Sequence, residues 1–369
     1  MHVVLAPDKF KGSLTAAEVA THLAAGLRSA VPGLDVREVP VADGGDGTLD
    51  AVVANGFRHV PVRATGPTGE PVDTGYAVRD GVAVVELADV SGLRRLPGAV
   101  LDPLHATSYG TGEVVRAALD AGVRTVVLGL GGSACTDGGA GMVQALGARL
   151  LDAEGRDLPP GGAALSTVDR VELDGLHPGV RTTEIVVASD VDNPLLGANG
   201  AAAVYGPQKG ATPTQVRLLD NALARWATAV HRVSTVDGAN LPGAGAAGGV
   251  GFAALTVLRA RVRPGIGYLL DVLEFGKHLA GARLVVTGEG SLDEQTLRGK
   301  APAGVAEAAA GVPVVAVAGR IEVAHVDLFA AMYALTDIEP DVRRCMTEAG
   351  PLLERLAAER LAKHLEVSP

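Results

Sequence analysis

Residues 3–18 read VVLAPDKFKGSLTAAE, which joins a short apolar run, a polar loop and the start of a helix. Pro7 ends the apolar run, so residues 3–6 are expected to form a buried strand. Thr15 and Glu18 have the spacing of a capping box, and apolar residues recur every four positions after them, which predicts a helix. The stretch therefore indicates one strand–loop–helix unit.

The same order of elements is repeated immediately downstream. Residues 36–41 are strand-like, residues 43–47 form a glycine-rich loop, and Thr48 is placed to cap a second helix. Two successive strand–loop–helix units are typical of a parallel sheet covered by helices.

The pattern changes after Phe57 and later returns. Strand-like runs at 60–64, 74–78 and 82–87 are joined by short turns, which predicts antiparallel hairpins. Helix–strand alternation then resumes, with helices expected at 111–121 and 351–365 and strands at 125–129, 185–188, 284–287, 314–318 and 333–336. We predict an α/β protein of two α/β domains: a Rossmann-like parallel-sheet domain built from both chain ends, residues 1–60 and 280–369, and an inserted mixed α/β domain, residues 61–279.

The charge balance excludes some classes of function. The 369 residues include 32 lysines and arginines and 42 aspartates and glutamates, for a formal net charge of −10. No cluster of basic and aromatic residues occurs in the sequence, which argues against nucleic-acid binding. The two cysteines give neither a disulfide framework nor a zinc spacing. The N-terminus does not resemble a signal peptide, and no apolar run approaches the roughly 20 residues of a membrane span. We therefore expect a cytoplasmic protein with no membrane partner, and its oligomeric state stays open.

Five loops that follow predicted strands carry the residue types that phosphoryl transfer requires, which are glycine amides, lysines and acids. In open α/β sheets, ligands bind at this end of the strands. In the first loop, Lys9 and Lys11 precede an open helix N-terminus, which makes an anion site, although an ordinary solvated loop explains them as well. In the second, Asp43 and Asp46 stand among three glycines and could reach a metal or substrate hydroxyls, or else form a plain turn beside a helix dipole.

The third loop, residues 129–141, contains six glycines in thirteen positions. Glycine at this density is costly to order unless the backbone needs positive φ angles or a close approach to a ligand. We interpret Gly131, Gly132 and Ser133 as a phosphate or substrate cradle, with tight helix-on-sheet packing as the alternative. Cys135 is expected to be a packed residue rather than a nucleophile.

The fourth loop contains Asp190 and Asp192, directly after the predicted strand 185–188. Two aspartates at the end of a buried strand suit Mg²⁺ ligation or general-base catalysis, and an Asx turn before Pro194 is the alternative. Farther along the chain, Lys209 lies on a rigid glycine–proline loop and is a candidate phosphate contact.

The fifth loop contains Glu289 between two glycines, followed by Asp293 and then by Lys300. An acid at a strand end, with a second acid and a lysine close behind, again suits metal and phosphate. Composition and spacing alone therefore indicate a phosphate-handling α/β enzyme, and they name no substrate.

Other functions fit parts of this pattern. Gly129, Gly131 and Ala134 follow a predicted strand and match a dinucleotide fingerprint. Asp152 lies about twenty residues later, where such proteins place the acid that binds the ribose, so an NAD-dependent dehydrogenase of a small hydroxy acid is an alternative. Against it, further glycines of the third loop would fall inside the expected helix, each costing about 1 kcal/mol relative to alanine. Serine-hydrolase and P-loop motifs do not occur in the sequence. A non-enzymatic sugar-acid binding protein also stays open.

Taken together, the loops closely resemble the type I glycerate kinase family over nearly the whole chain. The matching segments are residues 6–15, 40–48, 86–93, 106–113, 129–141, 189–195, 205–211, 242–251 and 286–293. The chain departs from the family pattern where Cys135 and Thr136 replace an expected Thr-Asn pair. Asp46 stands where Glu is frequent, and Ser291 stands where Arg is frequent. The last change could weaken one anion contact, so Ser291 is given no role.

The resemblance implies transfer of the γ-phosphoryl group of ATP to D-glycerate, with Mg²⁺, giving 2-phosphoglycerate and ADP; phosphorylation at carbon 3 stays open. It also implies two α/β domains with the active site in the crevice between them, on which all five loops would converge.

We assign each candidate residue a hypothetical role in this reaction. The catalytic residues would be Asp190, which orients or deprotonates the hydroxyl, and Lys9. The substrate would be bound by Lys11, Ser13, Asp43, Asp46 and Asn193. Phosphate or nucleotide would be bound by Gly131, Gly132, Ser133, Lys209 and Lys300. The metal would be bound by Asp192, Glu289 and Asp293.

Overall fold

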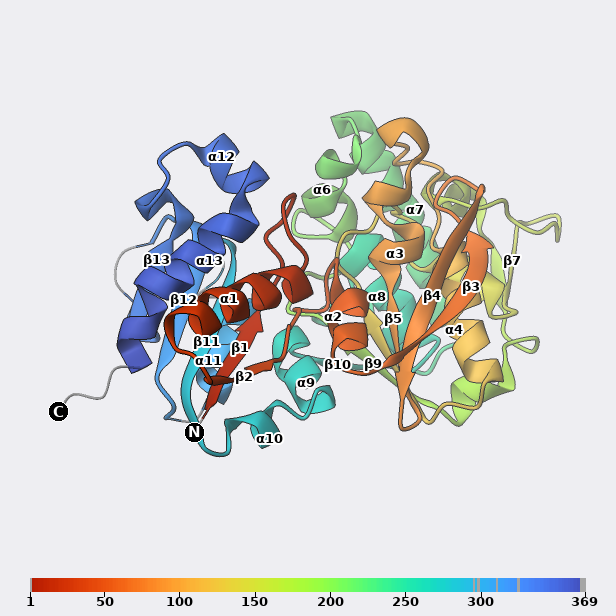
Figure 1. Ribbon diagram of the computed structural model, residues 1–369. Coiled ribbons are helices and arrows are strands. Elements are labelled where there is room, and N and C mark those ends of the chain that lie inside the picture. The colour runs from red at the N-terminus through yellow and green to blue at the C-terminus, as the bar shows by residue number, and fades with distance from the viewer. Residues whose placement is uncertain (1, 295, 297–298, 310, 324–325, 366–369) are drawn as a thin grey trace. The chain divides into compact units, whose positions relative to one another are not determined.

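The computed structural model describes residues 2–294, 296, 299–309, 311–323 and 326–365, which fold as two compact units (Figure 1). The terminal unit comprises residues 1–43, 50–56 and 264–369, and the inserted unit comprises residues 44–49 and 57–263. Each unit has its own sheet and its own buried core. This division follows from which residues pack together within each unit. The sequence-based domain limits at 60/61 and 279/280 remain a prediction.

The sheet of the terminal unit has five parallel strands in the order β2-β1-β11-β12-β13. Their bounds are β1 (His2–Pro7), β2 (Asp35–Glu38), β11 (Ala282–Leu292), β12 (Val314–Ile321) and β13 (Ala331–Ala334). The central strands are rich in valine and alanine because both faces of a parallel sheet are buried. This order is that of a doubly wound sheet, whose connections change direction between β1 and β11.

Helices from both chain ends cover this sheet. On one face, Val3, Leu5 and Val286 form a single buried cluster with the apolar sides of α1 (Ala16–Ala30) and α13 (Ala349–Glu359). The capping box predicted for α1 is present. The Glu18 N–H donates to the Thr15 hydroxyl at 3.2 Å, and the Thr15 N–H donates to the Glu18 carboxylate at 2.8 Å.

The strands and helices form close to their predicted positions, with shifts at some ends. The strand predicted at 36–41 stops at Glu38. Beyond it, Val39 and Val41 still donate hydrogen bonds to β1, but Pro40 between them has no N–H to give. The last predicted strand is β13, which is followed by a 3₁₀ turn, and the terminal helix is α13, which also ends in a 3₁₀ turn.

The inserted unit contains a six-stranded sheet in the order β10-β9-β6-β5-β4-β3 and a two-stranded ribbon, β7-β8. The bounds are β3 (Arg58–Thr65), β4 (Pro71–Arg79), β5 (Val82–Glu86), β6 (Thr125–Gly129), β7 (Arg149–Leu151), β8 (Arg170–Glu172), β9 (Glu184–Ala188) and β10 (Arg261–Arg263). β3, β4 and β5 pair antiparallel, as predicted, whereas β5, β6, β9 and β10 run parallel. The predicted fold class, a parallel-sheet α/β domain from both chain ends with an inserted mixed α/β domain, is confirmed.

The other helices connect and cover these strands. They are α2 (Thr48–Ala54), α3 (Leu87–Ser91), α4 (Tyr109–Asp120), α5 (Ala140–Ala145), α6 (Ala201–Tyr205), α7 (Pro213–His231), α8 (Ala246–Thr256), α9 (Gly265–Val272), α10 (Phe275–Leu279), α11 (Ala301–Ala308) and α12 (Val342–Thr347). The 3₁₀ turns are Leu93–Arg95, Pro97–Ala99, Gly162–Thr167, Pro178–Arg181, Pro207–Lys209, Leu335–Asp337 and Leu361–Leu365.

The core of the inserted unit includes an aromatic pair. Trp226 of α7 and Phe252 of α8 meet edge to face, with 6.3 Å between ring centroids.

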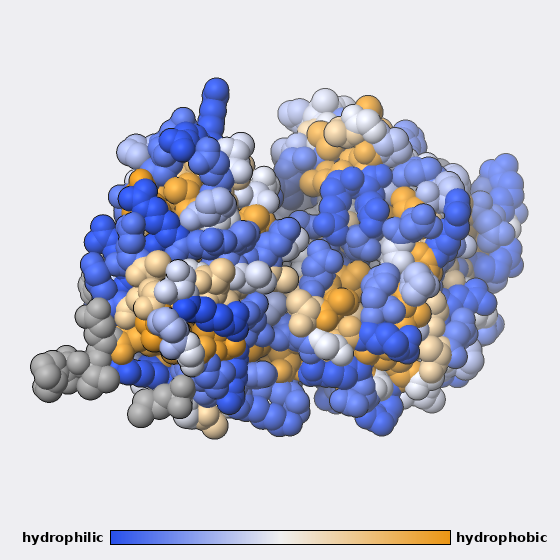
Figure 2. Space-filling model, in the orientation of Figure 1, coloured by the Kyte–Doolittle hydropathy of each residue, from blue (hydrophilic) through white to orange (hydrophobic). Residues whose placement is uncertain are grey.

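Hydrophilic residues cover most of the face shown in Figure 2, and apolar residues lie in smaller groups between them. None of the helices in the described part of the chain is long and apolar enough to cross a membrane.

Candidate active site

In the terminal unit, buried acids gather where β1 and β11 lie side by side. Asp8 follows β1 and is 8% exposed. Its N–H donates to the Gly288 carbonyl at 2.8 Å, and its Oδ1 accepts the Lys9 N–H at 2.6 Å. Burial raises the pKa of Asp8 to about 7, and the charges of Asp43 and Glu289 act in the same direction. This is where the connections of the sheet change direction, and doubly wound proteins bind their ligands at that point.

Glu289 connects this cluster to the fifth predicted loop. It is 9% exposed and accepts the Thr296 hydroxyl at 2.5 Å. The Lys300 Nζ lies 3.5 Å from Glu289 Oε2 and 3.8 Å from Asp293 Oδ1. Burial raises the pKa of Glu289, while the bond from Thr296 and the charge of Lys300 oppose that rise. Acids and lysines of the first, second and fifth predicted loops therefore lie together in this unit.

Lys11 and Ser13 lie in the turn between β1 and α1. Lys11 is exposed. The Ser13 hydroxyl donates to the Met346 carbonyl at 2.6 Å, so it joins the turn to α12. The substrate contacts predicted for Lys11 and Ser13 remain predictions.

In the inserted unit, β5, β6 and β9 end in register, and residues 44–49 lie against these ends. The Gly131 N–H donates to the Gly44 carbonyl at 3.3 Å. A Cβ added at Gly44 would collide with the Ala188 carbonyl oxygen, and one added at Gly129 would collide with the Gly44 carbonyl oxygen. Glycine is required here because backbone packs directly on backbone. The second, third and fourth predicted loops therefore converge at one edge of this sheet.

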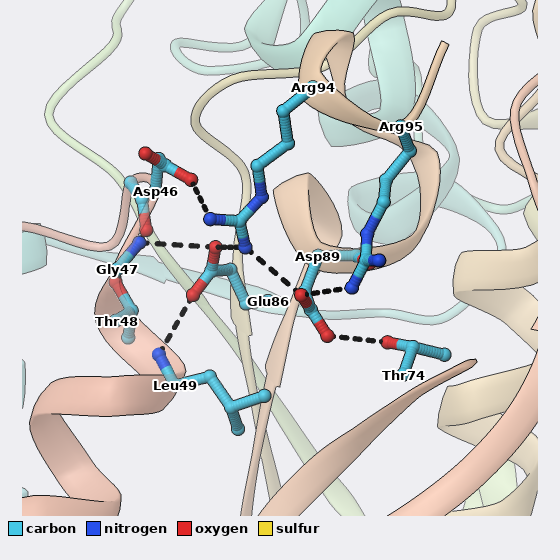
Figure 3. A network of polar contacts seen from close by, with 10 residues as sticks. Asp46, Gly47, Thr48, Leu49, Thr74, Glu86, Asp89, Arg94 and Arg95 are labelled. Carbon is cyan, nitrogen blue, oxygen red and sulfur yellow. Dashed lines mark hydrogen bonds and ion pairs between the residues drawn. The ribbon is translucent and has the colours of Figure 1, made fainter. Parts of the chain in front are cut away.

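A buried carboxylate that sequence reasoning missed fixes the second loop (Figure 3). Glu86 ends β5, is 1% exposed, and accepts the N–H groups of Gly47 at 3.1 Å and Leu49 at 2.8 Å. The predicted capping role of Thr48 is wrong. Thr48 is the first residue of α2, and its hydroxyl donates to the Gly45 carbonyl at 2.7 Å. The start of α2 is capped by Glu86 because the fold brings the end of β5 next to it.

Arg94 joins Glu86 to two further acids (Figure 3). Its Nη1 lies 2.7 Å from Asp46 Oδ1, and its Nη2 lies 3.2 Å from Glu86 Oε1 and 3.0 Å from Asp89 Oδ1. Asp89 also pairs with Arg95 at 2.6 Å. Burial raises the pKa of Glu86 to about 7, while the two loop amides and Arg94 oppose that rise. The loop that contains Asp46 is thus held through its backbone and through one of its side chains.

Two buried charged side chains fix the glycine-rich third loop. Lys209 is 1% exposed and donates to Ser133 Oγ at 2.8 Å and to the Cys135 carbonyl at 2.5 Å. Burial lowers the pKa of Lys209. Asp137 is fully buried, and its carboxylate accepts the Ser108 N–H at 2.8 Å together with amides of the loop itself. Sequence reasoning did not single out Asp137, and a direct contact of Lys209 with phosphate remains a prediction.

The third loop does not have the form of a dinucleotide fingerprint. Such a fingerprint opens a helix directly after its glycines. Here α5 begins only at Ala140, after the loop 130–139, and a Cβ at Gly131 would meet the backbone of Gly45. Cys135 is fully buried, and burial raises the pKa of its thiol well above the usual range. It is therefore a packed residue and not an activated nucleophile.

The fourth loop exposes its two aspartates. Asp190 and Asp192 follow β9 and are exposed to solvent. Asn193 Oδ1 accepts the Tyr205 hydroxyl at 2.6 Å, and its Nδ2 donates to the Asn199 carbonyl at 2.9 Å. Burial raises the pKa of Tyr205, and the charge of Asp192 acts in the same direction. The amide of Asn193 therefore helps to fix the loop that presents the two carboxylates.

The structure gathers the predicted site residues into two groups, one in each unit. The group in the terminal unit comprises Lys9, Asp43, Glu289, Asp293 and Lys300. The group in the inserted unit comprises Asp46, Gly131, Gly132, Ser133, Asp190, Asp192, Asn193 and Lys209. Convergence of all five loops on one crevice remains a prediction. Among the residues that the structure describes, no three His, Cys, Asp or Glu side chains are grouped so as to hold a metal ion.

Comparisons with known proteins agree on one family. The sequence pattern of the glycerate kinase family matches residues 3–366. A glycerate kinase of Bacillus subtilis is 46% identical over 87% of this chain and 85% of its own length. A glycerate 2-kinase of Escherichia coli is 44% identical over 87% of this chain and 86% of its own. A crystal structure from Salmonella typhimurium, described as a glycerate kinase 2, is 44% identical and superposes with a TM-score of 0.85 over 99% of this chain and 100% of that one.

Proposed function

Because the chain belongs to the glycerate kinase family, we propose that it transfers the γ-phosphoryl group of ATP to the hydroxyl oxygen on carbon 2 of D-glycerate, giving 2-phosphoglycerate and ADP. The relatives named glycerate kinase and glycerate 2-kinase support the reaction and the position. The structural observation that supports it best is the gathering of glycine amides, lysines and acids at the carboxyl ends of parallel strands.

Asp190 is the proposed base of this reaction. A bond forms between the glycerate oxygen and the γ-phosphorus, the bond from that phosphorus to the leaving ADP oxygen breaks, and the hydroxyl proton passes to the Asp190 carboxylate. The position of Asp190 supports this role, because its exposed side chain follows the end of β9 beside the glycine loop.

The other candidate residues are proposed to bind the reactants and to neutralise their charge. The amides of Gly131 and Gly132 and the hydroxyl of Ser133 provide donors for an anionic group. Lys9 and Lys300 counter the charge of the phosphates. Asp46, which Arg94 fixes at 2.7 Å, accepts a hydrogen bond from a substrate hydroxyl.

The carboxylates present suit Mg²⁺. This ion takes oxygen ligands, and it is usually bound by one or two carboxylates together with substrate phosphates, so a cage of three protein ligands is not needed. The candidate residues are Glu289 and Asp293 in the terminal unit and Asp192 in the inserted unit, of which one or two would hold the ion together with the ATP phosphates. When bound, Mg²⁺ neutralises charge on the ATP phosphates.

Release of ADP tests the proposal. Purified protein with ATP and Mg²⁺ should release ADP when D-glycerate is added and much more slowly with L-glycerate or with no acceptor. Excess EDTA should abolish the release, and added Mg²⁺ should restore it. Binding of D-glycerate without ADP release would instead indicate a sugar-acid binding protein, and reduction of NAD⁺ by D-glycerate would indicate a dehydrogenase.

A further inference from the structure

The carboxylate of Glu86 caps a helix that lies far from it in the sequence. Its oxygens accept the N–H groups of Gly47 and Leu49, which are 39 and 37 residues away (Figure 3). These N–H groups belong to the start of α2, where helices usually take their acceptor from a neighbouring N-cap side chain. The conformation of the loop at 44–49 therefore depends on the end of β5.

The same carboxylate also determines where Asp46 lies. Arg94 bridges Glu86 Oε1 at 3.2 Å and Asp46 Oδ1 at 2.7 Å through different nitrogens of one guanidinium. Glu86 is 1% exposed, whereas the side chains of Asp46 and Arg94 are 36% and 45% exposed. The buried carboxylate of Glu86 is thus the fixed point from which the partly exposed side chains of Asp46 and Arg94 are oriented.

The loop has little freedom to move without changing the site. Gly44 packs against the backbone of Ala188, and Gly131 packs against the backbone of Gly45. A shift of the loop would therefore change the position of Asp46 relative to the glycine cradle at 131–133. Because Asp46 binds the substrate in the proposed function, such a shift would weaken the binding of D-glycerate.

We propose that Glu86 is a positioning residue for the reaction. Its carboxylate fixes residues 44–49 so that Asp46 meets a hydroxyl group of the substrate. Glu86 itself does not touch the substrate, because its oxygens are occupied by Gly47, Leu49 and Arg94. This inference rests on the proposed function, in which Asp46 binds D-glycerate.

Glu86→Gln tests the proposal. The amide keeps one acceptor oxygen but turns its NH₂ group toward one of the two backbone donors, so the loop loses one hydrogen bond. We expect the KM for D-glycerate to rise about tenfold, which corresponds to the roughly 1.4 kcal/mol of one such bond. We expect the KM for ATP and the kcat to change about threefold or less.

Asp89→Asn is the matched control. Asp89 contacts the same guanidinium at 3.0 Å, and it also binds Arg95 and Thr74, whereas its hydrogen bonds do not reach the loop at 44–49. If Glu86 acted only by balancing the charge of Arg94, Glu86→Gln and Asp89→Asn would change the KM for D-glycerate equally. Positioning by Glu86 requires Asp89→Asn to leave the KM for D-glycerate within about threefold of the wild-type value.

Hydrogen exchange measures the loop directly and without turnover. In Glu86→Gln, one of the two amides, that of Gly47 or that of Leu49, should exchange at least about tenfold faster than in the wild type, because it loses its acceptor. Unchanged exchange at both amides, or equal changes in the KM values for ATP and D-glycerate, overturns the proposal. If Glu86→Gln does not fold, Glu86→Asp keeps the charge on a shorter side chain and should show the same selective effects. A wild-type protein without kinase activity would overturn the proposed function, and the exchange data would still decide whether Glu86 fixes the loop.

Discussion

Asp190 is the residue on which the proposed chemistry depends most. Asp190→Asn should lower kcat roughly 10²–10⁴-fold, the usual contribution of a general base, and change the KM for D-glycerate little. ADP release measures the effect, and circular dichroism with urea unfolding checks the fold. Asp192→Asn is the comparison. It should alter the dependence of the rate on Mg²⁺ and not the transfer of the hydroxyl proton. Near-normal kcat in a folded Asp190→Asn variant would exclude Asp190 as the base.

Lys209 is predicted to be essential for the stability of the glycine loop. Lys209→Met would leave Ser133 Oγ and the Cys135 carbonyl without this donor in a buried site. The free energy of unfolding should fall by about 1–3 kcal/mol. Lys277→Met is the control, since that side chain is 72% exposed and should change stability by no more than about 0.5 kcal/mol. Equal losses in the two variants, measured by urea unfolding, would contradict the role of Lys209.

The sequence could single out candidate site residues that have a distinctive local setting, and the roles proposed for these residues remain predictions. Lys9, Asp190 and Glu289 each stand just after or within a strand-like run and near glycine or further acids, which is a local pattern. Glu86 and Arg94 were not singled out, because their partners in the loop at 44–49 lie far from them in the sequence. The available signal for Glu86 was its place at the end of a predicted strand.

At the scale of elements, helix caps show why local patterns succeed or fail. The capping box of α1 was predictable because both of its partners lie within four residues. The cap of α2 was not predictable, because the fold brings in Glu86 and leaves Thr48 to bond the turn before it. The strand positions followed from apolar runs, since buried parallel strands need continuous hydrophobic sequence.

The link between β5 and α2 predicts a pH dependence of stability. The pKa of Glu86 is about 7 in the folded protein and near 4.5 when unfolded, so the native state binds the proton more tightly. Its contribution to stability is therefore fully present below about pH 4.5 and is lost as the pH rises through about 7. The loss is at most about 3.5 kcal/mol, since one pKa unit corresponds to about 1.4 kcal/mol and the two pKa values differ by about 2.5 units.

Urea unfolding at several pH values between 4.5 and 8 measures this effect. Glu86→Gln should show a smaller fall in stability over that range than the wild type. Some fall should remain, because the pKa of Asp8 is also raised to about 7. Parallel profiles for the wild type and the variant would contradict the assignment to Glu86.

At the scale of the whole molecule, the strand order could not be derived from hydrophobic runs. β1 pairs with β11, whose residues lie about 280 positions later, and valine-rich strands are interchangeable in pattern. The alternation of strand-like and helical segments nevertheless predicted the two α/β domains which the structure shows, and the resemblance to one family agreed with that prediction. Only the resemblance to this family predicted a specific substrate.

The most direct test of the account is a ³¹P NMR experiment on the purified protein with MgATP and D-glycerate. Phosphoryl transfer to the hydroxyl group on carbon 2 predicts loss of the three ATP signals and the appearance of ADP and 2-phosphoglycerate in equal amounts. An unchanged ATP spectrum would contradict the assignment as a kinase, and a signal of 3-phosphoglycerate in place of 2-phosphoglycerate would contradict the position.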